Sequence, residues 1–429
     1  MSMLGTDGTP ALDPAHAARR VLARADQLAT LTSMHDGIER VYLSPEHAAA
    51  HALAGDWMEQ AGMTTWRDEA GNQCGRRTVD VPDTPALLLG SHLDSVPNAG
   101  RYDGILGVLI AIEVAERLAG ADLPFALEVV AFGDEEGTRF GTTLLGSRAL
   151  AGTWRDEWID LRDEAGITLG EAAQDFGLDP QRMGRAARAP GSLIGYLEAH
   201  IEQGPKLEQQ NRPLGVVTAI AAAERRLIRF VGETRHAATP WELRQDALLA
   251  AAEAIVAIER VAREQRSNAT VGRIRVEPDA VNVVAGMAEI SLDLRDVNEK
   301  ERDQVWTLIR SALQTICLGR GIDFEVETMH RAAEAVCAPG LTGAIAAGVR
   351  AATGEERPME LVSIAGHDAM AVAELTGVAM LFVRCAGGIS HSPDESVTTE
   401  DVAVAIDAMH ATVLELAMRA AAGDPDAAA

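Results

Sequence analysis

Residues 86–132, ALLLGSHLDSVPNAGRYDGILGVLIAIEVAERLAGADLPFALEVVAF, decide the fold class of this chain. Two short apolar runs, 86–89 and 125–132, have the length of buried strands, and the longer apolar run 104–118 has the length of a buried helix. A strand, a helix and a second strand in this order are typical of an α/β domain with a largely parallel sheet. Such domains place their chemistry in the loops at strand ends, so the loops after these two strands are searched first.

The pattern changes at about Pro213 and changes back after Met329. Between these points the sequence predicts two strands, a helix, two strands, a helix and a last strand, which is the order of a compact α+β unit. We therefore predict a mixed-sheet α/β domain with helices on both faces, formed by residues 1–212 and 330–429, and interrupted by a smaller ferredoxin-like α+β domain at 213–329. The predicted elements outside the first stretch are strands at 214–220, 226–231, 270–276, 288–295, 323–327 and 378–383, and helices at 241–264, from Lys300 onward and at 402–420.

The chain is strongly acidic, because 38 basic residues against 64 acidic ones give a formal charge of −26. Without a basic cluster, this charge disfavours nucleic acid and anionic membranes as partners. A site for an anionic small molecule would need local positive charge from metals or arginine.

No run of about 18 uncharged apolar residues occurs, and Asp7 to Arg20 contain no apolar signal-peptide core. Four scattered cysteines favour reduced, buried thiols, so we expect a cytoplasmic protein.

The loop after the first strand carries His92 and Asp94, and Asp103 stands at the start of the predicted helix. A histidine at a strand end can bind a metal while a carboxylate two residues on accepts its other N–H and fixes the tautomer. Asp103 would be an oxygen ligand. Alternatively it caps the helix, because Asp before a glycine and an apolar run is a good N-cap.

The loop after the second strand carries Asp134, Glu135 and Glu136. Three consecutive carboxylates at the end of a buried strand repel one another, a cost that a bound cation would offset. A solvated acidic turn is the alternative. One glutamate of such a pair can bind metal while its neighbour acts as a general base. His200 and His391 each lie beside a strand-like segment and a turn, as imidazole ligands on a rigid scaffold should.

Together these motifs resemble the aminoacylase/carboxypeptidase superfamily of dinuclear zinc enzymes (peptidase family M20). Within it, they resemble the branch of N-carbamoyl-L-amino-acid hydrolases, allantoate amidohydrolases and β-ureidopropionases. The resemblance spans nearly the whole chain, from RVYLS (40–44) and DEAGN (68–72) to SHSP (390–393). Five ordered motifs at family spacing form a far more specific signal than a single match.

The resemblance implies a site for two divalent metal ions. The implied ligands are His92 and His200 for one ion, Glu136 and His391 for the other, and Asp103 as the bridge. Histidine at position 200, where the peptidase branches carry an acidic residue, indicates the carbamoyl branch. Glu135 would be the general base, and Asp94 would orient His92. Zinc, manganese, cobalt and nickel all accept such ligands, so the sequence does not choose the metal.

The resemblance also implies that the inserted domain forms a homodimer and closes over the site. His236 would reach the other subunit's site and stabilise the tetrahedral oxyanion, and Asn282 and Arg295 would bind substrate, with Arg295 pairing with its carboxylate. The remaining implied pocket residues are Gln203, Gly366 and His367. The chain departs from the family at HAATPW (236–241), which is one residue shorter than the usual HAGTTPM and ends in a bulky ring.

These features favour hydrolysis of a ureido or carbamoyl C–N bond in a small, carboxylate-bearing substrate, with release of ammonia and carbon dioxide. N-carbamoyl-L-amino acids and allantoate share a carboxylate beside a ureido group, so Arg295 does not distinguish them. An aminoacylase or dipeptidase that cuts an ordinary amide is the alternative enzyme. A metal-dependent binding protein without catalysis is the alternative outside enzymes.

Overall fold

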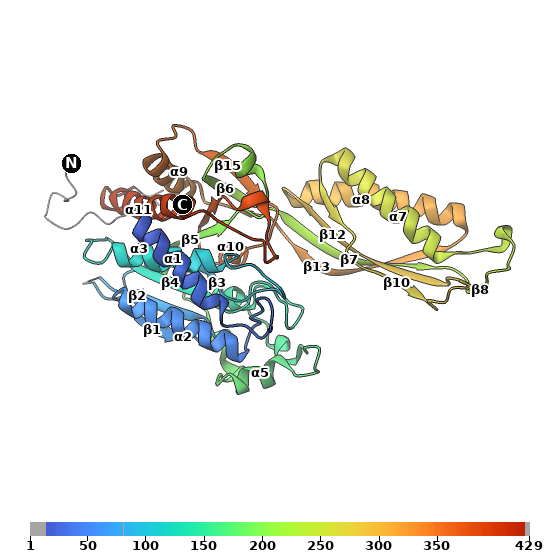
Figure 1. Cartoon of the computed structure of the whole chain (residues 1–429), viewed down its shortest axis with the longest axis horizontal. Helices are drawn as coiled ribbons and strands as arrows, with labels where there is room; N and C mark the ends of the chain where they lie inside the picture. The colour runs from blue at the N-terminus through green and yellow to red at the C-terminus, as the bar shows by residue number, and fades with distance from the viewer. Residues whose placement is uncertain (1–13, 80, 425–429) are drawn as a thin grey trace. The chain divides into compact units, whose positions relative to one another are not determined.

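The computed structural model describes residues 14–79 and 81–424, which divide into two compact units (Figure 1). The first unit contains the described residues of Met1–Thr218, Val336–Leu361 and His367–Ala429, and the second contains Ala219–Ala335 and Val362–Gly366. The beginning of the polar Asp7 to Arg20 stretch lies outside the described residues. Within the described ranges, no helix has the length and apolar character needed to cross a bilayer.

The first unit is built around a nine-stranded mixed sheet, which confirms the predicted α/β class. Strands β3, β4, β5 and β16 are parallel neighbours, whereas β1 and β2 run antiparallel to the strands beside them and β6 runs antiparallel to β16. The strands follow the order β1 (Thr64–Arg67), β2 (Gln73–Arg77), β4 (Ala126–Phe132), β3 (Ala86–His92), β5 (Leu193–Ile201), β16 (Val378–Val383), β6 (Leu214–Ile220) and β14 (Ala335–Val336), with β15 (Met359–Ser363) also paired to β6.

Helix α3 (Ile105–Arg117) packs on the central strands of this sheet, and Ile105 to Ala115 are all buried. A Cβ at Gly107 would collide with the carbonyl oxygen of Ala199, so glycine allows the helix to approach β5 closely.

All four cysteines are buried and unpaired, as predicted. The other helices are α1 (Pro14–Ala29), α2 (Pro45–Gln60), α4 (Leu145–Leu150), α5 (Leu169–Asp175), α6 (Lys206–Gln209), α9 (Pro339–Thr353), α10 (Asp368–Val372) and α11 (Thr399–Ala421), with short 3₁₀ turns η1 (Asp156–Asp160), η2 (Pro180–Ala186) and η4 (Ala386–Gly388).

The four parallel strands end at one edge of the sheet, and this edge collects the residues singled out from the sequence. His92 ends β3, Glu135 and Glu136 follow β4, His200 is the penultimate residue of β5, and His391 follows β16. The carboxyl edge of a parallel sheet is the usual position of a ligand site in α/β folds. Topology therefore brings together residues that are up to about 300 positions apart in the chain.

The second unit is a five-stranded antiparallel sheet with two long helices. Its order matches the βαββαβ order of ferredoxin-like folds when β9 and β10, which both pair with β12, are taken as one interrupted strand. Apolar residues of both helices and of the central strands form its core. A separate two-stranded ribbon pairs β8 (Arg235–His236) with β11 (Val283–Val284). The elements are β7 (Ala222–Val231), η3 (Trp241–Leu243), α7 (Ala247–Gln265), β9 (Asn268–Thr270), β10 (Ile274–Glu277), β12 (Met287–Asp296), α8 (Glu299–Arg320) and β13 (Asp323–Ala332).

Two sequence predictions need correction. Residues 214–220 were expected in the insert, but β6 pairs with β16 in the large sheet, where its apolar side chains are buried almost along the whole strand. The helix expected from Trp241 begins at Ala247 instead. Asp246 caps it by accepting a hydrogen bond from the backbone N–H of Leu249, and the preceding residues form a 3₁₀ turn.

Helix α2 buries two histidines, His47 and His51, whose rings lie 3.9 Å apart. Burial, together with the charges of Arg40 and Arg67, lowers the pKa of His51 to about 3. The unfolded chain binds a proton at this residue below about pH 6.5, whereas the folded chain does so only near pH 3, so stability falls as the pH drops between these values. We expect His51 to account for a loss of about 2 kcal/mol of unfolding free energy at pH 5.

Urea unfolding between pH 8 and pH 5 measures this effect. The variant His51→Gln should lose stability less steeply with falling pH than the wild type. His16→Gln is the matched control, because His16 is exposed and its replacement should leave the wild-type pH dependence unchanged. Identical pH profiles for His51→Gln and the wild type would contradict the expectation.

Candidate metal centre

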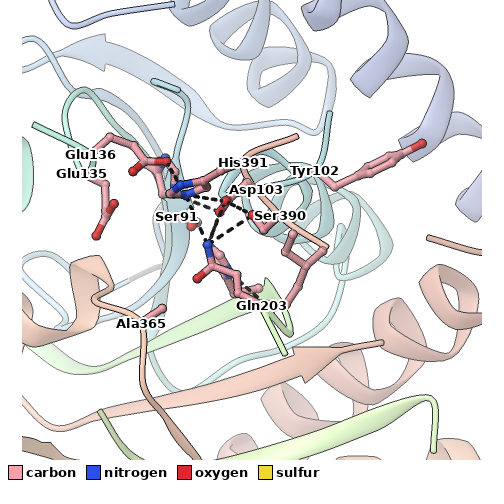
Figure 2. Close-up of polar contacts among 12 residues, drawn as sticks. Ser91, Tyr102, Asp103, Glu135, Glu136, Gln203, Ala365, Ser390 and His391 are labelled. Carbon is pink, nitrogen blue, oxygen red and sulfur yellow. Dashed lines mark hydrogen bonds and ion pairs between the residues drawn. The ribbon is translucent and has the colours of Figure 1, made fainter. Parts of the chain in front are cut away.

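Asp103 lies at the centre of the candidate site, with each carboxylate oxygen facing a different set of side chains (Figure 2). Its Oδ1 lies 3.1 Å from Nε2 of His200 and 3.9 Å from Nε2 of His92. Its Oδ2 lies 3.2 Å from Nε2 of His391, and the same nitrogen is 3.2 Å from Oε1 of Glu136. The five residues thus form two groups of possible ligands, His92–Asp103–His200 and Asp103–Glu136–His391, which share only Asp103.

The two inner histidines present Nε2 to this centre because their other ring nitrogens are engaged. Nδ1 of His200 lies 2.9 Å from the carbonyl oxygen of Ile201, to which it can donate. Nδ1 of His92 lies 3.3 Å from Oδ1 of Asp94 and 3.1 Å from its carbonyl oxygen. Such outer hydrogen bonds fix the tautomer and leave Nε2 with a lone pair for a metal.

The distances and charges of both groups fit divalent cations. Ligand atoms that each lie about 2.1 Å from a tetrahedral ion are separated by about 3.4 Å, close to the separations found here.

Hydrogen bonds to Asp103 and Glu136 raise the pKa of His391 to about 10. Although burial opposes it, the imidazoles of His200 and His391 hold the pKa of Asp103 well below its usual range. Positive charge is therefore stabilised where an ion would bind, and imidazole with carboxylate suits zinc, manganese, cobalt or nickel.

The alternative role of Asp103 as a helix cap is wrong. The N-cap of α3 is Gly104, which makes no side-chain cap, and the Asp103 carboxylate faces the histidines instead. Gly104 has a φ of +71°, and a Cβ on it would overlap the ring of His92. Glycine here meets both requirements, because it tolerates the left-handed backbone and leaves room for the imidazole.

Asp94 ties the two loops of the site together. Besides its contact with His92, its Oδ1 accepts a hydrogen bond from the backbone N–H of Glu135 (3.0 Å) and its Oδ2 one from that of Glu136 (3.1 Å). Figure 2 shows the Glu136 carboxylate directed at His391, whereas the Glu135 carboxylate takes part in none of the hydrogen bonds and ion pairs that the dashed lines mark. Burial and the neighbouring Glu136 raise the pKa of Glu135 well above its usual range, which suits a proton acceptor that works near neutral pH.

We expect Asp94→Asn to weaken metal binding by about 10- to 100-fold. The amide NH₂ that replaces a carboxylate oxygen cannot accept the hydrogen bonds which that oxygen receives from a backbone N–H and from the imidazole N–H. Titration of the metal-free protein with Zn²⁺ in the presence of a competing chelator measures the change. Asp36→Asn, at an exposed position, is the control. Unchanged affinity in Asp94→Asn would show that Asp94 does not orient the ligands.

The predicted substrate-binding residues fall into both units. In the first unit, Nε2 of Gln203 donates to Oδ2 of Asp103 (2.9 Å), and the ring of His367 packs edge-on against His200 with centroids 4.4 Å apart. In the second unit, His236 and Asn282 are neighbours, since Ala237 N–H donates to the Asn282 carbonyl (2.9 Å).

Arg295 and Gly366 also belong to the second unit. The Arg295 guanidinium donates to both carboxylate oxygens of Asp293 and to the carbonyl oxygen of Ile364. Arg295 is therefore held within the second unit by an ion pair. Any substrate carboxylate would have to share it with Asp293.

Glu395 and Ser390 were not predicted as site residues. Glu395 is 3% exposed and accepts hydrogen bonds from the backbone N–H groups of Tyr102 and Asp103, and Ser390 contacts Asp103 and Glu395. Burial and the charge of Asp103 raise the pKa of Glu395 to about 7. The only signal in the sequence was an acidic residue two positions after the SHSP motif.

Comparison with known proteins places the chain in a family. Residues 88–415 match the model of peptidase family M20/M25/M40. The chain belongs to this family. Among its relatives, an N-carbamoyl-L-amino acid amidohydrolase of Geobacillus stearothermophilus is 40% identical over 385 residues, covering 89% of this chain and 94% of that protein. A probable allantoate deiminase of Oryza sativa subsp. japonica is also 40% identical, covering 88% of this chain and 84% of that protein.

The fold is shared with solved structures. The crystal structure of an amidase of the hydantoinase/carbamoylase family from Burkholderia multivorans superposes with a TM-score of 0.82 at 30% identity. The match covers 92% of this chain and 97% of that one. The family resemblance that the motifs indicated is thus confirmed, and the match extends over both units of this M20 chain.

Proposed function

We propose that this protein is a metal-dependent amidohydrolase that cleaves the C–N bond of a small ureido or N-carbamoyl substrate bearing a carboxylate. The observation that carries the proposal is Asp103, whose two oxygens face two separate groups of imidazole and carboxylate ligands. The relatives named above support the substrate class, because both N-carbamoyl-L-amino acids and allantoate contain a ureido group beside a carboxylate.

In this proposal His92 and His200 would hold one ion, Glu136 and His391 the other, and Asp103 would bridge them. Such a pair of ions activates water and polarises the scissile carbonyl group. Glu135 removes the proton from the attacking water and delivers it to the leaving nitrogen, since its carboxylate is free of the ligand network. Asp94 and the Ile201 carbonyl group keep the two inner imidazoles in the tautomer that presents Nε2.

A substrate panel tests the proposal directly. Purified protein loaded with Zn²⁺ or Mn²⁺ is offered N-carbamoyl-L-amino acids, allantoate and N-acetyl-L-amino acids, and release of ammonia and of free amino acid is followed. We expect ammonia from at least one ureido substrate and loss of that activity with a chelator. Faster cleavage of the N-acetyl substrates would favour an aminoacylase, and activity that resists complete metal removal would overturn the metal mechanism.

We also propose that the chain forms a homodimer through its second unit, and that His236 of each subunit acts at the site of the other. Two inactive variants, His236→Ala and Glu135→Gln, should then complement each other. In an equal random mixture half of the dimers are mixed and half of their sites are intact, so roughly a quarter of the wild-type rate should return. No recovery after subunit exchange, verified by tagged co-purification, would show that His236 does not act in the other subunit.

A further inference from the structure

The buried carboxylate of Glu395 links two loops that approach each other at the candidate metal centre. One loop carries Tyr102 and Asp103, and the other carries Ser390 and His391. Glu395 Oε1 accepts a hydrogen bond from the backbone N–H of Tyr102 at 2.6 Å and one from that of Asp103 at 3.2 Å. These two amides begin the turn into α3, so the Glu395 carboxylate fixes the backbone from which the Asp103 side chain projects.

The other oxygen of Glu395 reaches the same centre through a hydroxyl group. Ser390 Oγ lies 3.2 Å from Oε2 of Glu395 and is in hydrogen-bond contact with Oδ2 of Asp103. Nε2 of Gln203 adds a donor to Asp103 Oδ2 at 2.9 Å and to Ser390 Oγ at 3.2 Å (Figure 2). Backbone and side chain of Asp103 are therefore both tied, directly or through Ser390, to a residue 292 positions away.

The packing around Glu395 leaves little freedom for this link. A Cβ at Gly100 would collide with the carboxyl group and the Cβ of Glu395. Glycine at position 100 therefore makes room for the carboxylate. A carboxyl group that is 3% exposed is costly to bury unless it finds hydrogen-bond partners. Here two backbone amides donate to Oε1, and Oε2 lies beside the Ser390 hydroxyl group.

We propose that Glu395 is a positioning residue that orients Asp103 as the bridge between the two ligand groups, acting through the backbone amides of Tyr102 and Asp103 and the hydroxyl group of Ser390. Glu395 itself belongs to neither group of possible metal ligands. The inference rests on the proposed function, because Asp103 needs such orientation only if it bridges two ions. Outer partners of metal ligands typically contribute 10- to 100-fold to metal affinity.

The test measures metal binding rather than activity. Metal-free wild type and variants are titrated with Zn²⁺ against a chromophoric chelator, and the melting temperature of each metal-free protein is recorded. Glu395→Met, which keeps the bulk but has no strong acceptor, should bind Zn²⁺ about 10- to 100-fold more weakly. Glu395→Gln retains an acceptor for the two amides and should recover most of the affinity. Asp394→Asn, the exposed neighbour, should match the wild type.

Two further variants keep the test decisive if Glu395→Met fails to fold. Gly100→Ala should displace the carboxylate, and Ser390→Ala should break the link to Oδ2 of Asp103, so both should weaken Zn²⁺ binding. Wild-type affinity in a folded Glu395→Met or in Gly100→Ala would overturn the inference, as would a Glu395→Gln variant as weak as Glu395→Met. A wild type that does not bind two ions would overturn the proposed function, and this inference with it.

Discussion

Replacing Glu135 by Gln is expected to lower kcat by about 10³-fold while leaving the metal content unchanged. The amide has the shape of the carboxylate but cannot accept a proton from water or pass one to the leaving nitrogen. Because the Glu135 carboxylate lies outside the ligand network, its replacement removes no contact from Asp103, Glu136 or His391. The measurement is the rate of ammonia release with the best substrate of the panel, together with elemental analysis of the protein.

The adjacent glutamate provides the sharpest comparison. Glu136→Gln should lose metal, because its Oε1 faces Nε2 of His391 and belongs to the second ligand group. Glu157→Gln, at an exposed position, should leave rate and metal content unchanged. A Glu135→Gln enzyme that keeps kcat within a factor of about ten would assign the general base to another group.

Replacing Asp103 by Ala should have the largest effect, with a loss in kcat/KM of more than about 10⁴-fold and failure to bind two ions. Both ligand groups depend on this carboxylate, since Oδ1 faces His200 and Oδ2 faces His391. Its loss would remove the negative charge that, in the proposed function, offsets two cations. Activity assays and metal titration of the purified variant check both parts of the expectation.

Chelation separates loss of metal from loss of fold. Wild type stripped of metal should lose its activity and regain it on adding Zn²⁺ or Mn²⁺, whereas Asp103→Ala should stay inactive under the same treatment. Asp122→Ala, at an exposed position in the same unit, is the control and should behave as the wild type. A reactivated Asp103→Ala enzyme would mean that the ions do not need this bridge.

Much of the fold could be predicted from local sequence patterns. The apolar runs of β3, α3 and β4 are long enough and uniform enough to identify a buried strand, helix and strand, and the structure places them within a few residues of the predicted limits. The start of α7 could not be predicted. The apolar pattern extends back to Trp241, whereas the Asp246 cap sets the beginning of the helix. The assignment of β6 also failed, since only its pairing with β16 shows which sheet it joins.

The site residues also divide into those that the sequence identified and those that only the structure revealed. Motifs at strand ends were enough to select His92, Glu135, Glu136, His200 and His391, because histidine and clustered carboxylates beside buried strands stand out against their surroundings. Glu395 was missed because an acidic residue two positions after the SHSP motif does not by itself indicate a role. Its partners are backbone amides almost 300 residues away in the chain, and backbone groups have no signature in a sequence.

The sequence by itself determined the residue types, their order and the alternation of strands and helices, because these depend on side chains within one or two turns of each other. Only the tertiary structure decided that β4, β3, β5 and β16 lie side by side, and that Asp103 faces histidines instead of capping a helix. Strand order and hydrogen-bond partners are set by packing between distant segments. A linear pattern of apolar and polar residues does not encode which of those segments meet.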